Sequence, residues 1–90
     1  MSKTILITGA SSGFGKAMAQ KFAAGGWNLI LTARRKEKLE ALASELAQQF
    51  GIKVLSLIFD IQNKEETFKH LANLPAEWQS VNVLVNNAGL

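Results

Sequence analysis

The sequence has no cysteine, a single proline, and no apolar run of the length that spans a bilayer. The absence of cysteine excludes disulfides and thiolate chemistry. Neither sign of charge dominates, since 10 basic and 7 acidic residues leave a net charge of +3. Its one basic cluster covers Arg34, Arg35, Lys36 and Lys38, whereas a nucleic-acid surface shows a basic stripe or run. We therefore expect a cytoplasmic protein that binds neither nucleic acid nor a membrane.

Four short runs rich in Ile, Leu and Val occupy residues 4–8, 28–33, 53–59 and 81–86. The apolar residues in these runs do not alternate with polar ones. This pattern is typical of strands that are buried on both faces of a parallel sheet. With 90 residues, of which 48% are apolar, the chain is long enough for one small domain at most.

Three stretches with helical spacing separate these runs. The first covers residues 13–24, and the second carries an apolar stripe from Leu39 to Phe50 and ends at Gly51, a typical C-terminal residue. The third is expected to begin after Asn63, which suits an N-cap, and to end before Pro75. Its predicted apolar face consists of Phe68, Leu71 and Ala72.

The resulting order β-α-β-α-β-α-β predicts an α/β fold with right-handed crossovers. The best match is the N-terminal half of a doubly wound, Rossmann-type parallel sheet, with strand order 3-2-1-4. In that order the fourth strand is an unprotected edge, although its sequence is that of a buried strand. We expect residues 1–90 to form an incomplete half-domain.

The segment Gly9–Gly13 matches G-x-S-x-G, the nucleophile elbow of serine hydrolases. Asp60 and the single histidine, His70, would complete a triad in the order Ser, Asp, His. However, His70 is expected roughly two turns into a helix, about 10 Å from the edge that carries Ser11, and pointing to solvent. Because a general base must lie within about 3 Å of its nucleophile, this interpretation is disfavoured.

An ATP-type phosphate loop is also disfavoured. It needs a glycine five residues before a Gly-Lys pair, and a Ser or Thr after that pair. Ala10 occupies the first of these positions and Ala17 the last.

A dinucleotide-binding loop explains the glycines better. Gly9 would end the first strand and make the turn, Gly13 would let the backbone approach a pyrophosphate, and Gly15 would let the helix pack closely on the sheet. The N–H groups at the helix N-terminus favour an anion. The hydroxyls of Ser11 and Ser12 could donate further hydrogen bonds to phosphate or ribose.

The end of the second strand indicates which dinucleotide is bound. In NAD-binding sites an acidic residue about twenty positions after the glycines binds the ribose 2′-hydroxyl. Here Ala33 stands at that place, and Arg34 and Arg35 follow. A guanidinium can pair with a 2′-phosphate through two hydrogen bonds, so the sequence favours NADP over NAD.

Two further segments are predicted to lie on the same edge. Asp60, at the end of the third strand, could accept a hydrogen bond from the adenine amino group and also stabilise a turn. The segment 86–89, Asn-Asn-Ala-Gly, follows the fourth strand and leaves room for a flat ligand.

The segments TGASSGFG (8–15), ARR (33–35), FDI (59–61) and NNAG (86–89) together resemble the classical short-chain dehydrogenase/reductase family. The resemblance covers the whole chain. It departs from the common pattern at Phe14, where an isoleucine is usual, and is nearest to a branch of NADP-dependent 3-hydroxy acid dehydrogenases. It implies NADP(H)-dependent hydride transfer between an alcohol and a carbonyl of a small substrate, in a homo-oligomer.

The resemblance also implies which residues contact the cofactor. They are Gly9, Ala10, Ser11, Ser12, Gly13, Phe14, Gly15, Arg34, Arg35, Asp60, Ile61, Asn87, Ala88 and Gly89. The catalytic tyrosine of the family has no counterpart, because the chain has no tyrosine. We therefore expect cofactor binding without activity. A complete, non-catalytic dinucleotide-binding module and an assembly fragment remain as alternatives.

Overall fold

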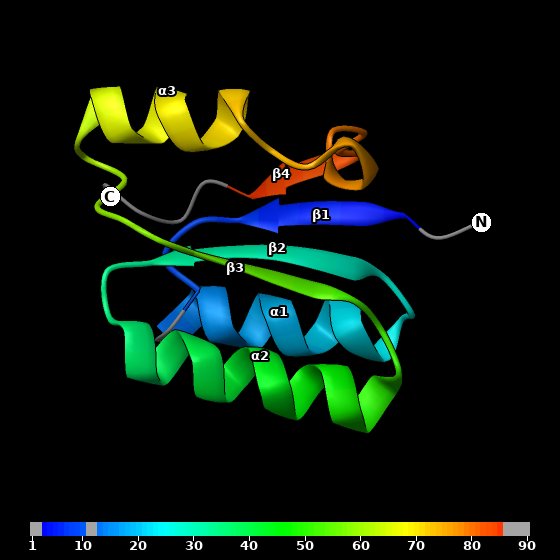
Figure 1. Ribbon diagram of the computed structural model, residues 1–90. Coiled ribbons are helices and arrows are strands. Elements are labelled where there is room, and N and C mark those ends of the chain that lie inside the picture. The colour runs from blue at the N-terminus through cyan, green and yellow to red at the C-terminus, as the bar shows by residue number, and fades with distance from the viewer. Residues whose placement is uncertain (1–2, 11–12, 86–90) are drawn as a thin grey trace.

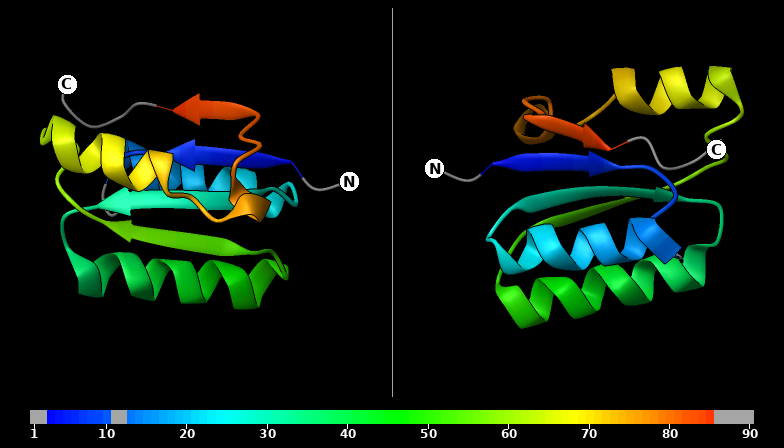
Figure 2. Two further views of the ribbon diagram at one scale, coloured as in Figure 1. Left: turned by 45° about the horizontal axis from the view of Figure 1, so that its top comes forward. Right: turned by 180° about the vertical axis from the view of Figure 1, so that it is seen from behind.

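The computed structural model describes residues 3–10 and 13–85. Strands β1 (Thr4–Ile7), β2 (Asn28–Ala33), β3 (Val54–Ile58) and β4 (Val83–Val85) form one sheet in the order β3-β2-β1-β4. All pairings in this sheet are parallel, and the arrows in Figure 2 point toward the same edge. This confirms the predicted α/β fold and its strand order.

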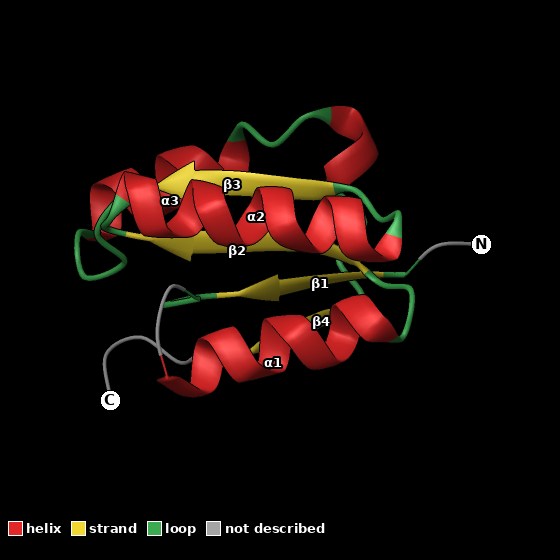
Figure 3. Ribbon diagram, turned by 90° about the horizontal axis from the view of Figure 1, so that it is seen from below, coloured by secondary structure: helices red, strands yellow, loops and turns green. Residues whose placement is uncertain are grey.

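Helices cover both faces of the sheet. Helices α1 (Gly13–Ala24) and α2 (Lys36–Phe50) lie on one face, and α3 (Lys64–Ala72) lies on the other (Figures 1 and 3). A short 3-10 turn, η1 (Ala76–Trp78), follows α3. As predicted, α2 ends at Gly51, which adopts a left-handed φ of 67° and donates its N–H to the carbonyl of Ala47.

The face toward α1 and α2 holds the larger core. Odd-numbered residues of β1 and β2 point to this side, because successive side chains of a strand alternate between the faces. Each large aliphatic side chain buried here contributes about 1.5–3 kcal/mol. The main members of this core are Ile5, Ile7, Ala19, Ala23, Leu29, Leu31, Leu39, Leu42 and Leu46.

The opposite face has a smaller core, formed mainly by the segment after α3. Leu6 of β1 and Ile30 of β2 pack there with Leu74 and Trp78. The apolar cover of this face therefore comes from the connection between α3 and β4.

The prediction for the apolar face of α3 is wrong. Phe68 is 76% exposed, Leu71 is 39% exposed, and Ala72 is also exposed. The half-buried residues of this helix are Thr67 and His70. On this face of the sheet the core is formed by Leu74 and Trp78, from the segment after α3, and neither Phe68 nor Leu71 belongs to it.

The expectation that all four strands are buried on both faces holds only for the central pair. The described residues of β1 are buried, and β2 is buried after Asn28, whereas β3 is half-buried along its length. On β4, Val83 is 38% and Leu84 is 60% exposed. Both outer strands lack a neighbour on one side within the described sheet, so their side chains lack cover too.

One polar group on the smaller face lacks a partner. Thr32 follows Ile30 on that side of β2, is 1% exposed, and its Oγ1 has no hydrogen-bond partner among the described residues. Replacing it by valine removes a buried hydroxyl that costs free energy when it is unpaired. We expect Thr32→Val to raise the free energy of unfolding by about 1 kcal/mol, measured by urea denaturation.

Thr8→Val is the matched control, since Thr8 Oγ1 donates to the carbonyl of Val85 at 3.4 Å. This substitution removes a bonded hydroxyl and should lower the free energy of unfolding by about 1 kcal/mol. Equal destabilisation by the two substitutions would contradict the assignment of Thr32.

Candidate functional site

The carboxyl ends of the four strands meet at one edge of the sheet. Hydrogen bonds continue across the strand ends there: Thr8 N–H donates to Val85 O at 3.0 Å, and Phe59 N–H donates to Ala33 O at 3.1 Å. β1 lies between β2 and β4, so the connections from β1 to β2 and from β3 to β4 run to opposite sides of the sheet. Ligands of open α/β sheets bind at such a switch point.

Two glycines in the loop after β1 adopt conformations that other residues rarely take. Gly9 has a φ of 63° and Gly13 a φ of 55°, both in the left-handed region. A Cβ built on Gly13 would meet no atom within 4 Å, so the space outside this residue is open. Gly13 is also the first residue of α1, whose N-terminus attracts an anion.

The remaining described residues of this loop have distinct environments. Ala10 is fully buried, and its N–H donates to Thr32 O at 3.0 Å. Gly15 is buried within α1, and its role in close helix packing stays a prediction. Phe14, in contrast, is 62% exposed. The predicted contacts of Ser11 and Ser12 lie outside the described residues.

Arg34 and Arg35 follow directly after β2 and are both exposed. Arg35 is the N-cap residue of α2, and its side chain makes no capping hydrogen bond. Within residues 3–10 and 13–85, neither guanidinium has an ion-pair partner. Two cations therefore follow β2, and no ion pair with a described acidic residue neutralises them.

Asp60 shapes the turn after β3. Its Oδ1 accepts the N–H of Gln62 at 2.9 Å, and its carbonyl accepts the N–H of Asn63 at 2.9 Å. Asn63 in turn caps α3, because its Oδ1 accepts the N–H of Glu66 at 3.1 Å. The predicted turn and N-cap are confirmed, and Ile61 is half-buried beside them.

The fourth predicted segment, 86–89, lies outside the described residues, and with it Asn87, Ala88 and Gly89. The residue before this segment, Val85, is the last of β4 and is aligned with Ile7 of β1. The described structure thus brings together the strand ends that precede all four predicted segments.

The predicted exposure of His70 is wrong. Its ring is half-buried and stacks on Phe59, with centroids 4.5 Å apart and an interplanar angle of 10°. His70 therefore lies against the residue that follows β3. A ring stacked in this way is held by an aromatic contact, and the described residues provide no nucleophile with which it forms a hydrogen bond.

Sequence reasoning missed two residues at this edge. Phe59 is 5% exposed and supports the Asp60 turn, and the Thr67 hydroxyl lies 3.1 Å from Ile61 O and 2.9 Å from Asn63 O. Phe59 could have been found from its position next to Asp60. Thr67 shares one side of α3 with His70, three residues further on, and that spacing was the available signal.

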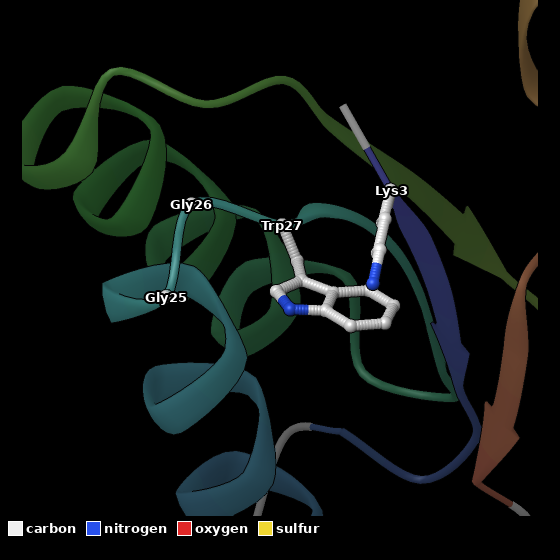
Figure 4. Close-up of a pocket in the computed structure, with 4 residues that line it drawn as sticks. All are labelled: Lys3, Gly25, Gly26 and Trp27. Atoms are coloured by element: carbon white, nitrogen blue, oxygen red, sulfur yellow. The ribbon is translucent and has the colours of Figure 1, made fainter. Parts of the chain in front are cut away.

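A cavity of about 250 Å³ lies at the opposite edge of the sheet. Its lining residues are Lys3, Gly25, Gly26 and Trp27, and Figure 4 shows the Lys3 amine beside the Trp27 ring, 5.4 Å from its centroid. Lys3 precedes β1 and Trp27 precedes β2. The cavity is therefore separate from the strand ends that carry the candidate site.

Two other kinds of feature are absent from the described part of the chain. It contains no group of three His, Cys, Asp or Glu side chains placed to hold a metal ion. No helix in it is long and apolar enough to cross a membrane.

Comparison with known proteins assigns the family. Residues 3–90 match the family described as short chain dehydrogenase. The chain belongs to this family. Its segment is 53% identical over all 90 residues to serine 3-dehydrogenase of Agrobacterium fabrum, and 44% identical over 86 residues to the NADP-dependent 3-hydroxy acid dehydrogenase of Salmonella typhi. The chain covers 34% and 33% of these proteins, or about a third of their length.

A solved structure of the family shares this fold. L-Sorbose reductase from Gluconobacter frateurii, in complex with NADPH and L-sorbose, superimposes on 99% of the chain with a TM-score of 0.90 and 35% sequence identity. The chain covers 34% of that protein. The short-chain dehydrogenase fold thus accounts for nearly all of the present chain.

Proposed function

We propose that this chain binds NADP(H) at the carboxyl edge of its sheet. It would form the cofactor-binding half-domain, residues 1–90, of a short-chain dehydrogenase that acts on an alcohol and its carbonyl counterpart. The similarity to serine 3-dehydrogenase and to a 3-hydroxy acid dehydrogenase supports a 3-hydroxy acid as the alcohol. We further propose that the whole enzyme is a homo-oligomer.

The conformation of the glycine loop supports phosphate binding. Gly9 and Gly13 have positive φ, the space outside Gly13 is open, and the N-terminus of α1 lies at the same place. Backbone N–H groups at a helix start neutralise a pyrophosphate without needing a cationic side chain. Ala10 would connect this loop to β2, because its N–H donates a hydrogen bond to the carbonyl of Thr32.

The observation that carries the choice of cofactor is the pair of unneutralised arginines after β2. Ala33 is buried and, unlike the acidic residue of NAD-binding sites, has no carboxylate that would repel a 2′-phosphate. The exposed guanidiniums of Arg34 and Arg35 are available for charge-assisted hydrogen bonds to it. The residues present therefore fit NADP(H) better than NAD(H).

The residues of this chain would bind and orient the cofactor. When bound, the nicotinamide supplies or accepts the hydride. Asp60 and Ile61 would face the adenine, and Asn87, Ala88 and Gly89 would line the remainder of the site. Proton transfer to the substrate oxygen needs a further group, because the chain has no tyrosine. We therefore expect nucleotide binding without dehydrogenase activity from these 90 residues.

Arg34→Ala is the direct test of the cofactor preference. The substitution removes hydrogen bonds between two charged groups, so we expect NADPH to bind about 10- to 100-fold more weakly. NADH, which has no 2′-phosphate, should bind as it does to the original chain. Fluorescence or calorimetric titration measures both affinities.

Lys38→Ala is the matched control, because it removes one exposed positive charge from α2, the helix that follows the two arginines. It should change NADPH affinity less than twofold. Equal affinity of the original chain for NADPH and NADH, unchanged by Arg34→Ala, would refute the proposed preference.

Gly13→Ala tests the phosphate loop, and Gly51→Ala is its control. Both glycines have a φ near +60° and open space at the Cβ position, so either alanine should destabilise the fold by about 1–2 kcal/mol. Gly51 follows the C-terminus of α2, away from the candidate site. We expect only Gly13→Ala to weaken NADPH binding beyond its effect on stability. A similar loss in both variants would argue against the loop.

The exposed edge strand β4 favours a chain that self-associates over a complete, non-catalytic module that stays monomeric. Val83 and Leu84 expose apolar side chains on β4. This strand pairs with β1 on one side and has no partner strand on its other side within the described sheet. Such an edge pairs readily with further strands. We expect sedimentation of the isolated chain to show concentration-dependent self-association. A stable monomer would instead favour the non-catalytic module.

A further inference from the structure

Helix α3 contacts the rest of the protein along a single narrow side. Of its nine residues, Lys64 to Ala72, only Thr67 and His70 are half-buried, and all others are exposed. Residues three apart lie on the same side of a helix. The attachment of α3 therefore depends on one hydroxyl and one aromatic ring, which both point at the segment between β3 and α3.

The ring of His70 secures the start of that segment. It stacks at 4.5 Å, nearly parallel, on Phe59, which is 5% exposed and directly precedes Asp60. Phe59 also donates its N–H to the carbonyl of Ala33 at 3.1 Å. The stack thus links α3 to the hydrogen bond that joins the ends of β2 and β3. Its acceptor residue directly precedes Arg34, and its donor residue directly precedes Asp60.

The hydroxyl of Thr67 secures the other end. It lies within hydrogen-bond distance of the carbonyls of Ile61 and Asn63, at 3.1 and 2.9 Å. Between these points the turn is closed internally, because Asp60 accepts the N–H groups of Gln62 and Asn63. Side chains of α3 therefore contact both ends of the turn, and hydrogen bonds to Asp60 stabilise its middle.

We propose that His70 and Thr67 are positioning residues, which hold the turn at Asp60 and Ile61 in the shape that receives the adenosine half of NADP(H). This inference rests on the proposed function. Neither residue needs to touch the nucleotide, since each acts through Phe59 or through the carbonyls of the turn. Helix α3 then supports the ligand site through the turn that it contacts.

The test titrates the full chain with adenosine 2′,5′-bisphosphate and compares His70→Ala with His70→Phe. Loss of an aromatic pair should weaken binding about three- to tenfold. Phenylalanine keeps a flat ring over Phe59 and should restore affinity to within twofold. The same logic applies to Thr67→Val, which removes the hydroxyl, and Thr67→Ser, which keeps it.

Phe68→Ala is the matched control on the same helix, because that ring is mostly exposed. It should leave the affinity unchanged. Hydrogen exchange gives a second, ligand-free readout: the amides of Gln62 and Asn63, which donate to Asp60, should exchange at least threefold faster in His70→Ala. Amides of β2 should not change, which separates a local effect from general unfolding.

The possible results separate the two proposals. Unchanged affinity and unchanged exchange in His70→Ala would overturn the positioning role, as would failure of His70→Phe to restore either quantity. If the original chain binds no adenosine nucleotide, the proposed function fails. In that case the exchange rates still decide whether α3 holds the turn, because they are measured without ligand.

Discussion

The parallel hydrogen-bonded ladder around β1 is the constraint on which the candidate site depends. β1 pairs with β2 on one side and β4 on the other, and both pairings align Ile7 with partners near the strand ends, Leu31 and Val85. Parallel pairing places every carboxyl end at one edge. Segments distant in sequence, after Ile7, Ala33, Ile58 and Val85, therefore meet there without any need for side-chain contacts between them.

The two faces of the sheet are stabilised unequally, and this difference bears on function. The face under α1 and α2 holds a continuous aliphatic core. The first residue of α1 is Gly13, and α2 begins directly after Arg35. The core of the other face is formed by Leu74 and Trp78 with Leu6 and Ile30, and Thr67 and His70 are the half-buried residues of α3. Because so few side chains of α3 are buried, a substitution there should change the Asp60 turn without unfolding the protein.

Family membership and site geometry support the proposal in different ways. The match to the short chain dehydrogenase family over residues 3–90 establishes the family, and the L-sorbose reductase complex shows that a protein with this fold binds NADPH. Arg34 and Arg35, which form no ion pair with another described residue, are an independent, physical reason to expect the phosphorylated cofactor here. Since the chain spans about a third of the length of its relatives, the substrate and activity of the whole enzyme are proposals.

The sequence by itself determined the element order, the strand order, and the bounds of α1, because apolar runs, helical spacing and glycine positions are local signals. It also indicated the arginines after β2 and the cap at Asn63. Only the tertiary structure decided which side of α3 is buried. Phe68 and Leu71 have the right spacing for a core, but the core on that face is formed by Leu74 and Trp78, and Phe68 and Leu71 stay exposed. Burial depends on what the rest of the chain leaves uncovered, and no local pattern records it.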